Sequence, residues 1–149
     1  MPSSSNPSGP GLLTATFNGH RLGDSFLDTG SEAYYFADAS IPDCTQPAFA
    51  GFFCPASPLD LSPTLTGTSN VTVSAAFTLF NPTGLGAAIN VAPGVGIDSA
   101  SGNTSFDFGI PFYFGRTVYT AIEGLNAGGT EAPTWRSEGR GSPILTNPA

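Results

Sequence analysis

The stretch Phe26-Leu27-Asp28-Thr29-Gly30-Ser31 places a carboxylate directly after an apolar segment and directly before a glycine. Asp, Gly and Ser are common turn residues, so the Asp-Thr-Gly-Ser letters alone also suit an ordinary turn. The preceding sequence is more informative. Loose alternation over Leu12 to Phe17, the turn signal Asn18-Gly19 and the segment Leu22 to Leu27 predict a β-hairpin. The hairpin delivers Asp28 to a loop.

The composition predicts a single β-rich domain. The chain has 149 residues, of which 10% are charged, against a usual value of about a quarter. It contains 19 glycines and 14 prolines, which favours loops and strands over helices. Lysine is absent, so the basic residues are four arginines and one histidine, and the net charge is −7. We therefore expect no nucleic-acid partner, because no basic stripe is available to follow a phosphate backbone.

The two cysteines, Cys44 and Cys54, give information about the cellular compartment of the protein. Their spacing and the single histidine match no common zinc site, so we expect no metal and no cofactor. We predict a local disulfide in an exported protein (periplasmic, cell-surface or secreted), with two free buried thiols as the alternative.

No apolar run approaches the roughly 18 residues that a spanning helix needs, so we expect no membrane span.

The sequence divides the chain into three predicted regions. Residues 1–10 are expected to be a disordered leader or linker, residues 11–124 the domain, and residues 125–149 a weakly ordered tail. Within the domain we expect a short aromatic strand, a long loop pinned by the disulfide, a half-buried strand, a weaker strand and a central apolar run. These are Ala33 to Phe36, Asp38 to Pro63, Val71 to Leu79, Ala87 to Ala92 and Phe106 to Ile122.

The hairpin, the Asp-Thr-Gly-Ser loop, the aromatic strand and the late glycine-bearing run together resemble the pepsin and retropepsin superfamily of aspartic peptidases over about residues 11–124. The run FDFGIPFYFGRTVYTAIEG (residues 106–124) also resembles a signature of bacterial exported proteins with an aspartic-peptidase-like domain. The resemblance implies an all-β lobe, a small closed or sandwiched barrel with at most one short helix around residues 115–122. It also implies that an apolar-apolar-Gly segment threads behind the aspartate loop. The candidates are Phe108-Gly109 and Phe114-Gly115.

The same resemblance implies the chemistry of the site. Asp28 would be the catalytic carboxylate of an endopeptidase, acting on a polypeptide by activating water, while Thr29, Gly30 and Ser31 would support the loop. Such a site needs two carboxyl groups that share a proton. Only one such loop is present, so the second Asp is expected from a symmetric partner or another lobe. Asp98, which follows Val95-Gly96-Ile97, is a weaker candidate within the chain.

Two alternatives follow from the sequence. The first is a non-catalytic exported binding or structural domain that keeps the architecture without a complete dyad. The second is an esterase, because Gly23-Asp24-Ser25 resembles the serine block of Gly-Asp-Ser esterases. That enzyme class needs a late histidine base, whereas the only histidine, His20, lies five residues before Ser25.

Overall fold

The computed structural model describes residues 13–67, 70–85, 93–100 and 102–120, together with short strands at 126–127, 130–131 and 135–139. Across these residues the regular structure is β-strand, with three single-turn 3-10 helices at Pro47–Phe49 (η1), Pro82–Gly84 (η2) and Ile110–Tyr113 (η3), and no α-helix. The predicted all-β fold is confirmed. In this same part of the chain no helix is long and apolar enough to cross a membrane.

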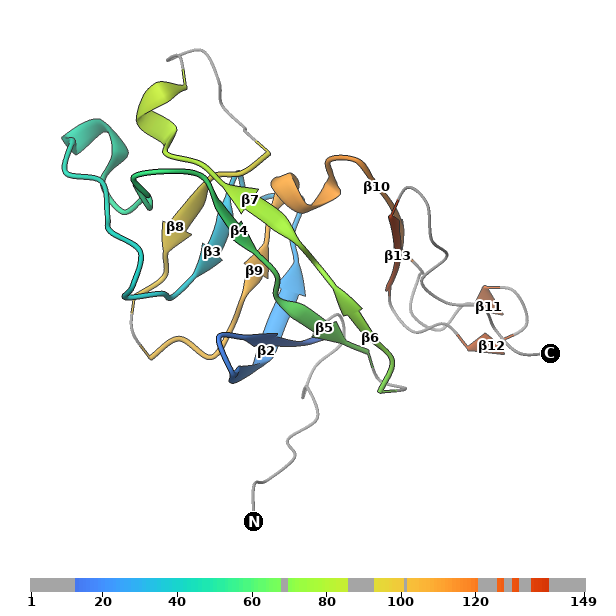
Figure 1. The fold of residues 1–149 in the computed structure, drawn as a ribbon. Coiled ribbons are helices and arrows are strands. Elements are labelled where there is room, and N and C mark those ends of the chain that lie inside the picture. Colours follow the sequence, from blue (N-terminus) through green and yellow to red (C-terminus); the bar gives the residue numbers. More distant parts are fainter. Residues whose placement is uncertain are drawn as a thin grey trace.

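One seven-stranded sheet organises the molecule (Figure 1). Its strand order is β6-β5-β1-β2-β9-β3-β8. The strands are β1 (Leu13–Phe17), β2 (His20–Leu27), β3 (Tyr34–Phe36), β5 (Thr64–Thr66), β6 (Thr72–Ser74), β8 (Gly96–Asp98) and β9 (Asp107–Phe108).

The predicted hairpin is formed by β1 and β2. Asn18 and Gly19 both have positive φ angles, 48° and 77°, which suits a tight two-residue turn between antiparallel strands. The register shifts between Leu13 and Ala15, where Leu13 faces Ser25 and Ala15 faces Leu22. β2 therefore has one more residue than β1 between these two pairs, and it ends at Leu27, directly before Asp28.

The two-residue strand β9 lies between β2 and β3, the strands joined by the aspartate loop. It runs parallel to β2, with Phe26 opposite Asp107, and antiparallel to β3, with Tyr34 opposite Phe108. The loop at residues 28–33 must therefore cross over the end of β9. This crossing fixes the position of the loop against the sheet.

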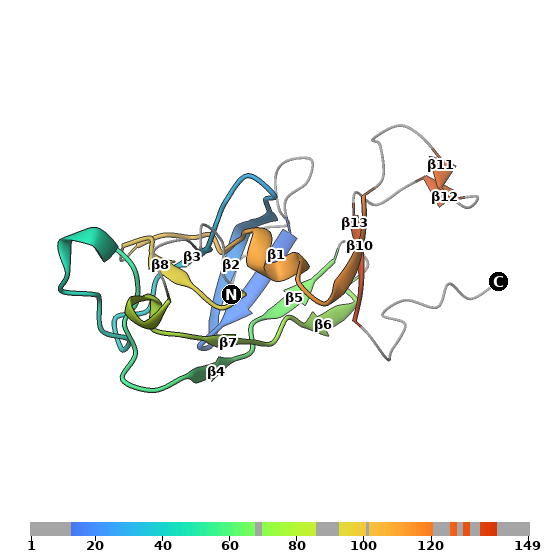
Figure 2. The same ribbon diagram turned by 90° about the horizontal axis from the view of Figure 1, so that it is seen from above.

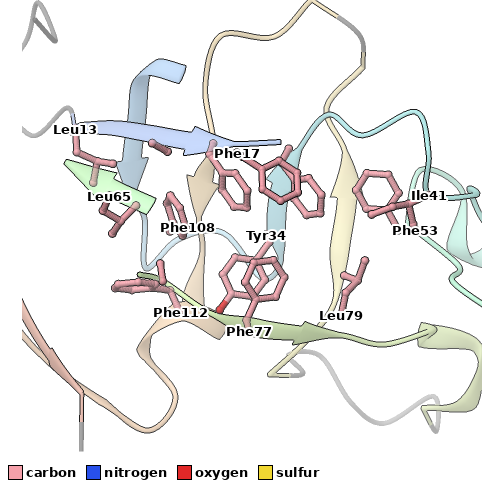
Figure 3. Close-up of a cluster of buried hydrophobic side chains, with 14 residues drawn as sticks. Leu13, Phe17, Tyr34, Ile41, Phe53, Leu65, Phe77, Leu79, Phe108 and Phe112 are labelled. Atoms are coloured by element: carbon pink, nitrogen blue, oxygen red, sulfur yellow. The ribbon is translucent and has the colours of Figure 1, made fainter. Parts of the chain in front are cut away.

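A second layer covers one face of the sheet. It is the antiparallel pair β4 (Leu59–Leu61) and β7 (Phe77–Leu79), which Figure 2 shows beside the main sheet. Between the layers the Tyr34 and Phe77 rings stack at 3.9 Å between centroids (Figure 3). Phe36, Phe106 and Phe108 continue the aromatic core, with Phe106 stacked on both other rings. Burial of such side chains is the main favourable term holding the layers together.

The architecture is a sandwich and not a closed barrel, because β6 and β8 remain the two edges of the described sheet. One sequence prediction was wrong in detail. The segment Val71 to Leu79 is not one strand, since the chain changes layer at Ala75 and Ala76: β6 pairs with β5, and β7 pairs with β4. At most one short helix was expected around residues 115–122, and over Arg116–Thr120 the structure has strand β10 instead.

The predicted tail contributes β-structure. Strand β13 (Trp135–Gly139) pairs with β10, and β11 (Asn126–Ala127) pairs with β12 (Thr130–Glu131). The other residues of the predicted tail lie outside the described part of the chain, as do the predicted leader at residues 1–10 and the whole of the strand predicted at Ala87 to Ala92.

The long loop before β4 is closed by the predicted disulfide between Cys44 and Cys54. The Cys44 N–H donates to Phe52 O at 2.8 Å and the Cys54 N–H donates to Pro42 O at 2.7 Å. Between them Phe53 is fully buried, and its N–H donates to Gly96 O of β8 at 2.9 Å. The disulfide therefore holds a loop that supplies a core side chain.

We expect the double variant Cys44→Ala/Cys54→Ala to lose about 3 kcal/mol of unfolding free energy, because the cross-link restricts a short loop in the unfolded chain. Urea denaturation of the variant and the oxidised wild type measures the difference, and reduced wild type is the control. Equal stability of all three samples would contradict a stabilising role for the disulfide.

Candidate functional site

The Asp28 carboxylate lies at the end of β2, half-buried on a loop whose tip, Thr29 and Gly30, is exposed. The Asp28 N–H donates to Phe108 O at 3.1 Å, which continues the β2–β9 pairing into the loop. Its Oδ1 accepts the Gly30 N–H at 2.7 Å. These contacts fix the backbone of Asp28 and one of its carboxylate oxygens, Oδ1, close to solvent.

Gly109 lies directly behind this loop. A Cβ atom at residue 109 would be 2.1 Å from Ala33 O and 2.5 Å from Ser31 O, so only glycine fits without moving backbone. The next N–H, that of Ile110, donates to Ser31 O at 2.7 Å. Of the two segments proposed from the sequence, Phe108-Gly109 is therefore the one against the loop.

Phe114 and Gly115 lie elsewhere. Phe114 is 47% exposed, and a Cβ at Gly115 would meet nothing within 4 Å. The neighbouring Arg116 donates from Nη1 to Phe112 O at 2.7 Å and from Nη2 to Ala76 O at 2.6 Å, and its guanidinium sits over the Phe112 ring. This segment ties η3 to the turn between β6 and β7.

A second carboxyl group, Asp107, lies beside the loop, and the sequence predictions did not include it. Phe106 and Phe108 point into the aromatic core, so alternation along the strand turns Asp107 to the other face of the sheet. Its exposed fraction is only 8%. The signal was present in the letters Phe-Asp-Phe, where one charged residue interrupts an apolar strand.

Ser31 joins the two carboxyl groups. Its Oγ lies 3.0 Å from Asp28 Oδ2 and 2.7 Å from Asp107 Oδ2. The Asp107 Oδ1 atom is buried without a hydrogen-bond partner in the described structure. The structure thus connects two carboxyl groups that lie 79 residues apart in sequence through one hydroxyl.

Burial and nearby negative charges raise the pKa values of three acidic groups in this cluster. Burial, with smaller contributions from the negative charges of Asp28 and Glu32, raises the pKa of Asp107 to about 6, although the Ser31 hydroxyl opposes the shift. Burial first, and then the hydrogen bond and charge of Glu32, raise the pKa of Tyr35 to about 12. Burial and the charges of Asp28 and Asp107 also raise the pKa of Tyr113.

The other candidate residues from the sequence analysis lie away from this cluster or have side chains that already hydrogen-bond to the backbone. Ser25 is fully buried; its hydroxyl donates to Leu22 O at 3.0 Å and accepts the Phe106 N–H at 2.9 Å, so it is not placed as an esterase nucleophile. His20 starts β2, at the end opposite Asp28. Asp98 faces Phe36 at the far end of β3, and its Oδ1 accepts the Ala100 N–H at 3.0 Å.

A hollow of about 960 Å³ opens at that far end, lined among others by His20, Asp38 and Asp98. The Asp38 carboxylate accepts from Asn18 Nδ2 at 2.8 Å and from Ser40 Oγ at 2.6 Å. These acidic groups stabilise the neighbouring turns. We therefore take the Asp28 loop, and not this hollow, as the candidate site. Within the described residues no three His, Cys, Asp or Glu side chains gather to hold a metal ion.

A family model described as "Protein of unknown function (DUF3443)" matches residues 4–136. The chain belongs to the DUF3443 family. No curated protein and no solved structure was found to match it. The matched residues include both the Asp28 loop and the Asp107–Gly109 segment, so the candidate site of this DUF3443 protein lies wholly inside the family region.

We expect Gly109→Ala to destabilise the DUF3443 domain by about 3 kcal/mol or more, because the new methyl group would overlap two backbone oxygens that cannot rotate away. Chemical denaturation measures the loss. Gly23→Ala in β2 is the matched control, since a Cβ there would meet nothing within 4 Å. If both variants lose the same small amount, the close approach behind the loop is not a structural constraint.

We expect the wild-type free energy of unfolding to fall relative to that of Asp107→Asn as pH rises from about 4 to about 7. The folded protein holds the Asp107 proton more tightly than the unfolded chain, so this stabilisation is complete below the ordinary pKa of 3.8 and is lost through the folded pKa of about 6. The relative change should be about 3 kcal/mol. Denaturation curves across this pH range measure it.

Asp60→Asn is the control for that series. It removes an exposed carboxylate in β4 that accepts the Thr78 hydroxyl at 2.7 Å, far from the aspartate loop along the chain. A trend common to both variants would reflect the loss of one negative charge in general. A wild-type curve parallel to that of Asp107→Asn would contradict the raised pKa.

Proposed function

We propose that this DUF3443 protein is an exported aspartic-type endopeptidase half-site, in which Asp28 activates a water molecule for attack on a peptide bond. The observation that carries the proposal is the setting of Asp28. Its carboxylate lies on an exposed loop, accepts from the Gly30 N–H and contacts the Ser31 hydroxyl, and the loop is backed by Gly109.

The chemistry follows from that setting. A carboxylate near solvent is a base that takes a proton from water, and hydrogen bonds from the loop fix the direction of its lone pairs. Water then attacks the substrate carbonyl directly, so no covalent intermediate with the protein forms. The second carboxyl group of such a site donates a proton to the carbonyl oxygen as negative charge develops there.

That second group is proposed to come from a symmetric copy of the chain or from another lobe. Asp-Thr-Gly-Ser occurs once in the sequence, and the exposed Thr29 and Gly30 leave the loop tip open to a facing surface. Asp107 is not suited to this role, because at 8% exposure it is covered by the protein and a polypeptide cannot reach it. A homodimer would bring two Asp28 loops together about a twofold axis.

Export is proposed from the Cys44–Cys54 disulfide, since such bonds persist in oxidising compartments. The single aspartate loop also favours a second candidate function, a non-catalytic exported domain that keeps the loop as part of its fold. The two candidates differ in whether removing the Asp28 charge abolishes a reaction.

The test combines solution mass with cleavage of a denatured protein substrate at acid pH, using wild type, Asp28→Asn and the control Asp60→Asn. We expect a dimer whose specific activity rises with protein concentration, and a loss of about 100-fold or more in Asp28→Asn with no loss in the control. A monomer that cleaves nothing would instead support the non-catalytic domain. Cleavage that survives Asp28→Asn would overturn the assignment of Asp28.

A further inference from the structure

We propose that Asp107 is a positioning residue for Asp28, acting through Ser31 by holding the proton that directs the Ser31 hydroxyl toward Asp28. This inference rests on the proposed function, because it assigns a role in preparing Asp28 for water activation. It adds a residue that the Asp-Thr-Gly-Ser loop does not itself contain. The residue reaches the loop from β9 and not from a partner.

The Ser31 hydroxyl has one hydrogen atom and two carboxyl neighbours. Ser31 Oγ lies within hydrogen-bond distance of Asp28 Oδ2 and of Asp107 Oδ2, at 3.0 and 2.7 Å. A hydroxyl carries a single hydrogen and donates it to a single acceptor. Both contacts are hydrogen bonds only if one carboxyl group is protonated and donates to the serine oxygen.

Burial decides which carboxyl group carries that proton. Asp107 is 8% exposed and its Oδ1 has no partner among the described residues, whereas Asp28 is half-buried and its Oδ1 accepts the Gly30 N–H. An ion at Asp107 would leave one buried oxygen without a donor, which is costly. The protonated group is therefore Asp107, and the chain runs from Asp107 Oδ2–H to Ser31 Oγ–H to Asp28 Oδ2.

Among the described residues, no positively charged group is among those that shift the pKa of Asp107. The titratable groups that act on it or respond to it are Asp28 and Glu32 from the loop, Tyr35 from β3 and Tyr113 from η3. All four are acids, and Phe26, its partner on β2, is apolar. Like charges nearby disfavour a second anion, so the neutral form of Asp107 is maintained into weakly acidic solution.

The arrangement makes the site sensitive to pH. When Asp107 loses its proton to solvent, the Ser31 hydroxyl faces two anions with one hydrogen. The 2.7 Å contact to Asp107 then competes with the 3.0 Å contact to Asp28. Asp28 keeps the Gly30 N–H but loses its second donor, so its carboxylate is no longer fixed. We expect the site to work below the ionisation of Asp107 and to fail above it.

The first test does not depend on catalysis. Carboxyl carbon NMR of Asp-labelled protein, from about pH 3 to about pH 8, follows the titration of Asp107. The midpoint should lie above the ordinary value of about 3.9. It should fall in Asp28→Asn, which removes a like charge, and shift in Ser31→Ala, which removes the partner of both the protonated and the ionised carboxyl group. Asp60→Asn should leave it unchanged. An ordinary midpoint, or one that neither Asp28→Asn nor Ser31→Ala moves, overturns the inference.

The second test is the pH profile of peptide cleavage. Asp107→Asn should keep acid activity and extend it to higher pH, because its amide N–H donates to Ser31 Oγ at every pH. Asp107→Leu offers no donor and should have about a tenth of the acid activity of wild type, but this lower activity should not fall further across the ionisation range of Asp107, because no second anion forms. Equal profiles for wild type and both variants would overturn the positioning role, as would loss of activity in Asp107→Asn with its fold retained.

The two proposals fail separately. If the wild type cleaves nothing while the Asp107 midpoint is raised and shifts as expected, the peptidase function is wrong and the proton linkage among Asp28, Ser31 and Asp107 stands. If the wild type cleaves and Asp28→Asn does not, but the Asp107 midpoint is ordinary, the function stands and the role of Asp107 is wrong.

Discussion

The fold depends on the passage of β9 between β2 and β3, under the loop that joins them. Two strands consecutive in sequence are usually neighbours, and here a strand from about 80 residues later separates them. The passage is possible because residue 109 has no side chain, so the chain leaves β9 in contact with the carbonyl oxygens of Ser31 and Ala33. The backbone at residue 109 thus packs directly against the loop and restricts its position. The orientation of Asp28 follows from this packing.

Strand alternation gives β9 and β3 two faces with different roles. On one face Tyr34, Phe36, Phe106 and Phe108 form the aromatic core with Phe77 of the second layer. On the other face Tyr35 and Asp107, which are register partners, lie with the aspartate loop. The same short strands thus anchor the sandwich and present polar groups. A change on the core side would move the site, since both faces share one backbone.

The site itself concentrates acid in a protein with few charges. Burial and the charges of Asp28 and Glu32 raise the pKa of Asp107, and the pKa values of the two tyrosines beside them are raised by burial and by these acids. In the described part of the chain no arginine is among the groups that shift the pKa of Asp107, and Arg116 is bound instead to carbonyl oxygens of Phe112 and Ala76. Proton sharing through Ser31 is then the means by which two nearby carboxyl groups avoid a double negative charge.

The sequence by itself determined the local features: the β1–β2 hairpin through Asn18-Gly19, the all-β class, the aspartate loop at the end of β2 and the pairing of the only two cysteines. Each depends on residues close together in the chain, where turn chemistry and alternation act directly. Only the tertiary structure decided that Gly109 and not Gly115 lies behind the loop, that the segment after Val71 turns a corner between layers, and that Asp107 meets Ser31. These are contacts between distant segments, fixed by which strands pair and not by any local pattern. A carboxylate inside an apolar run shows only that something must stabilise it, and the fold supplies the partner.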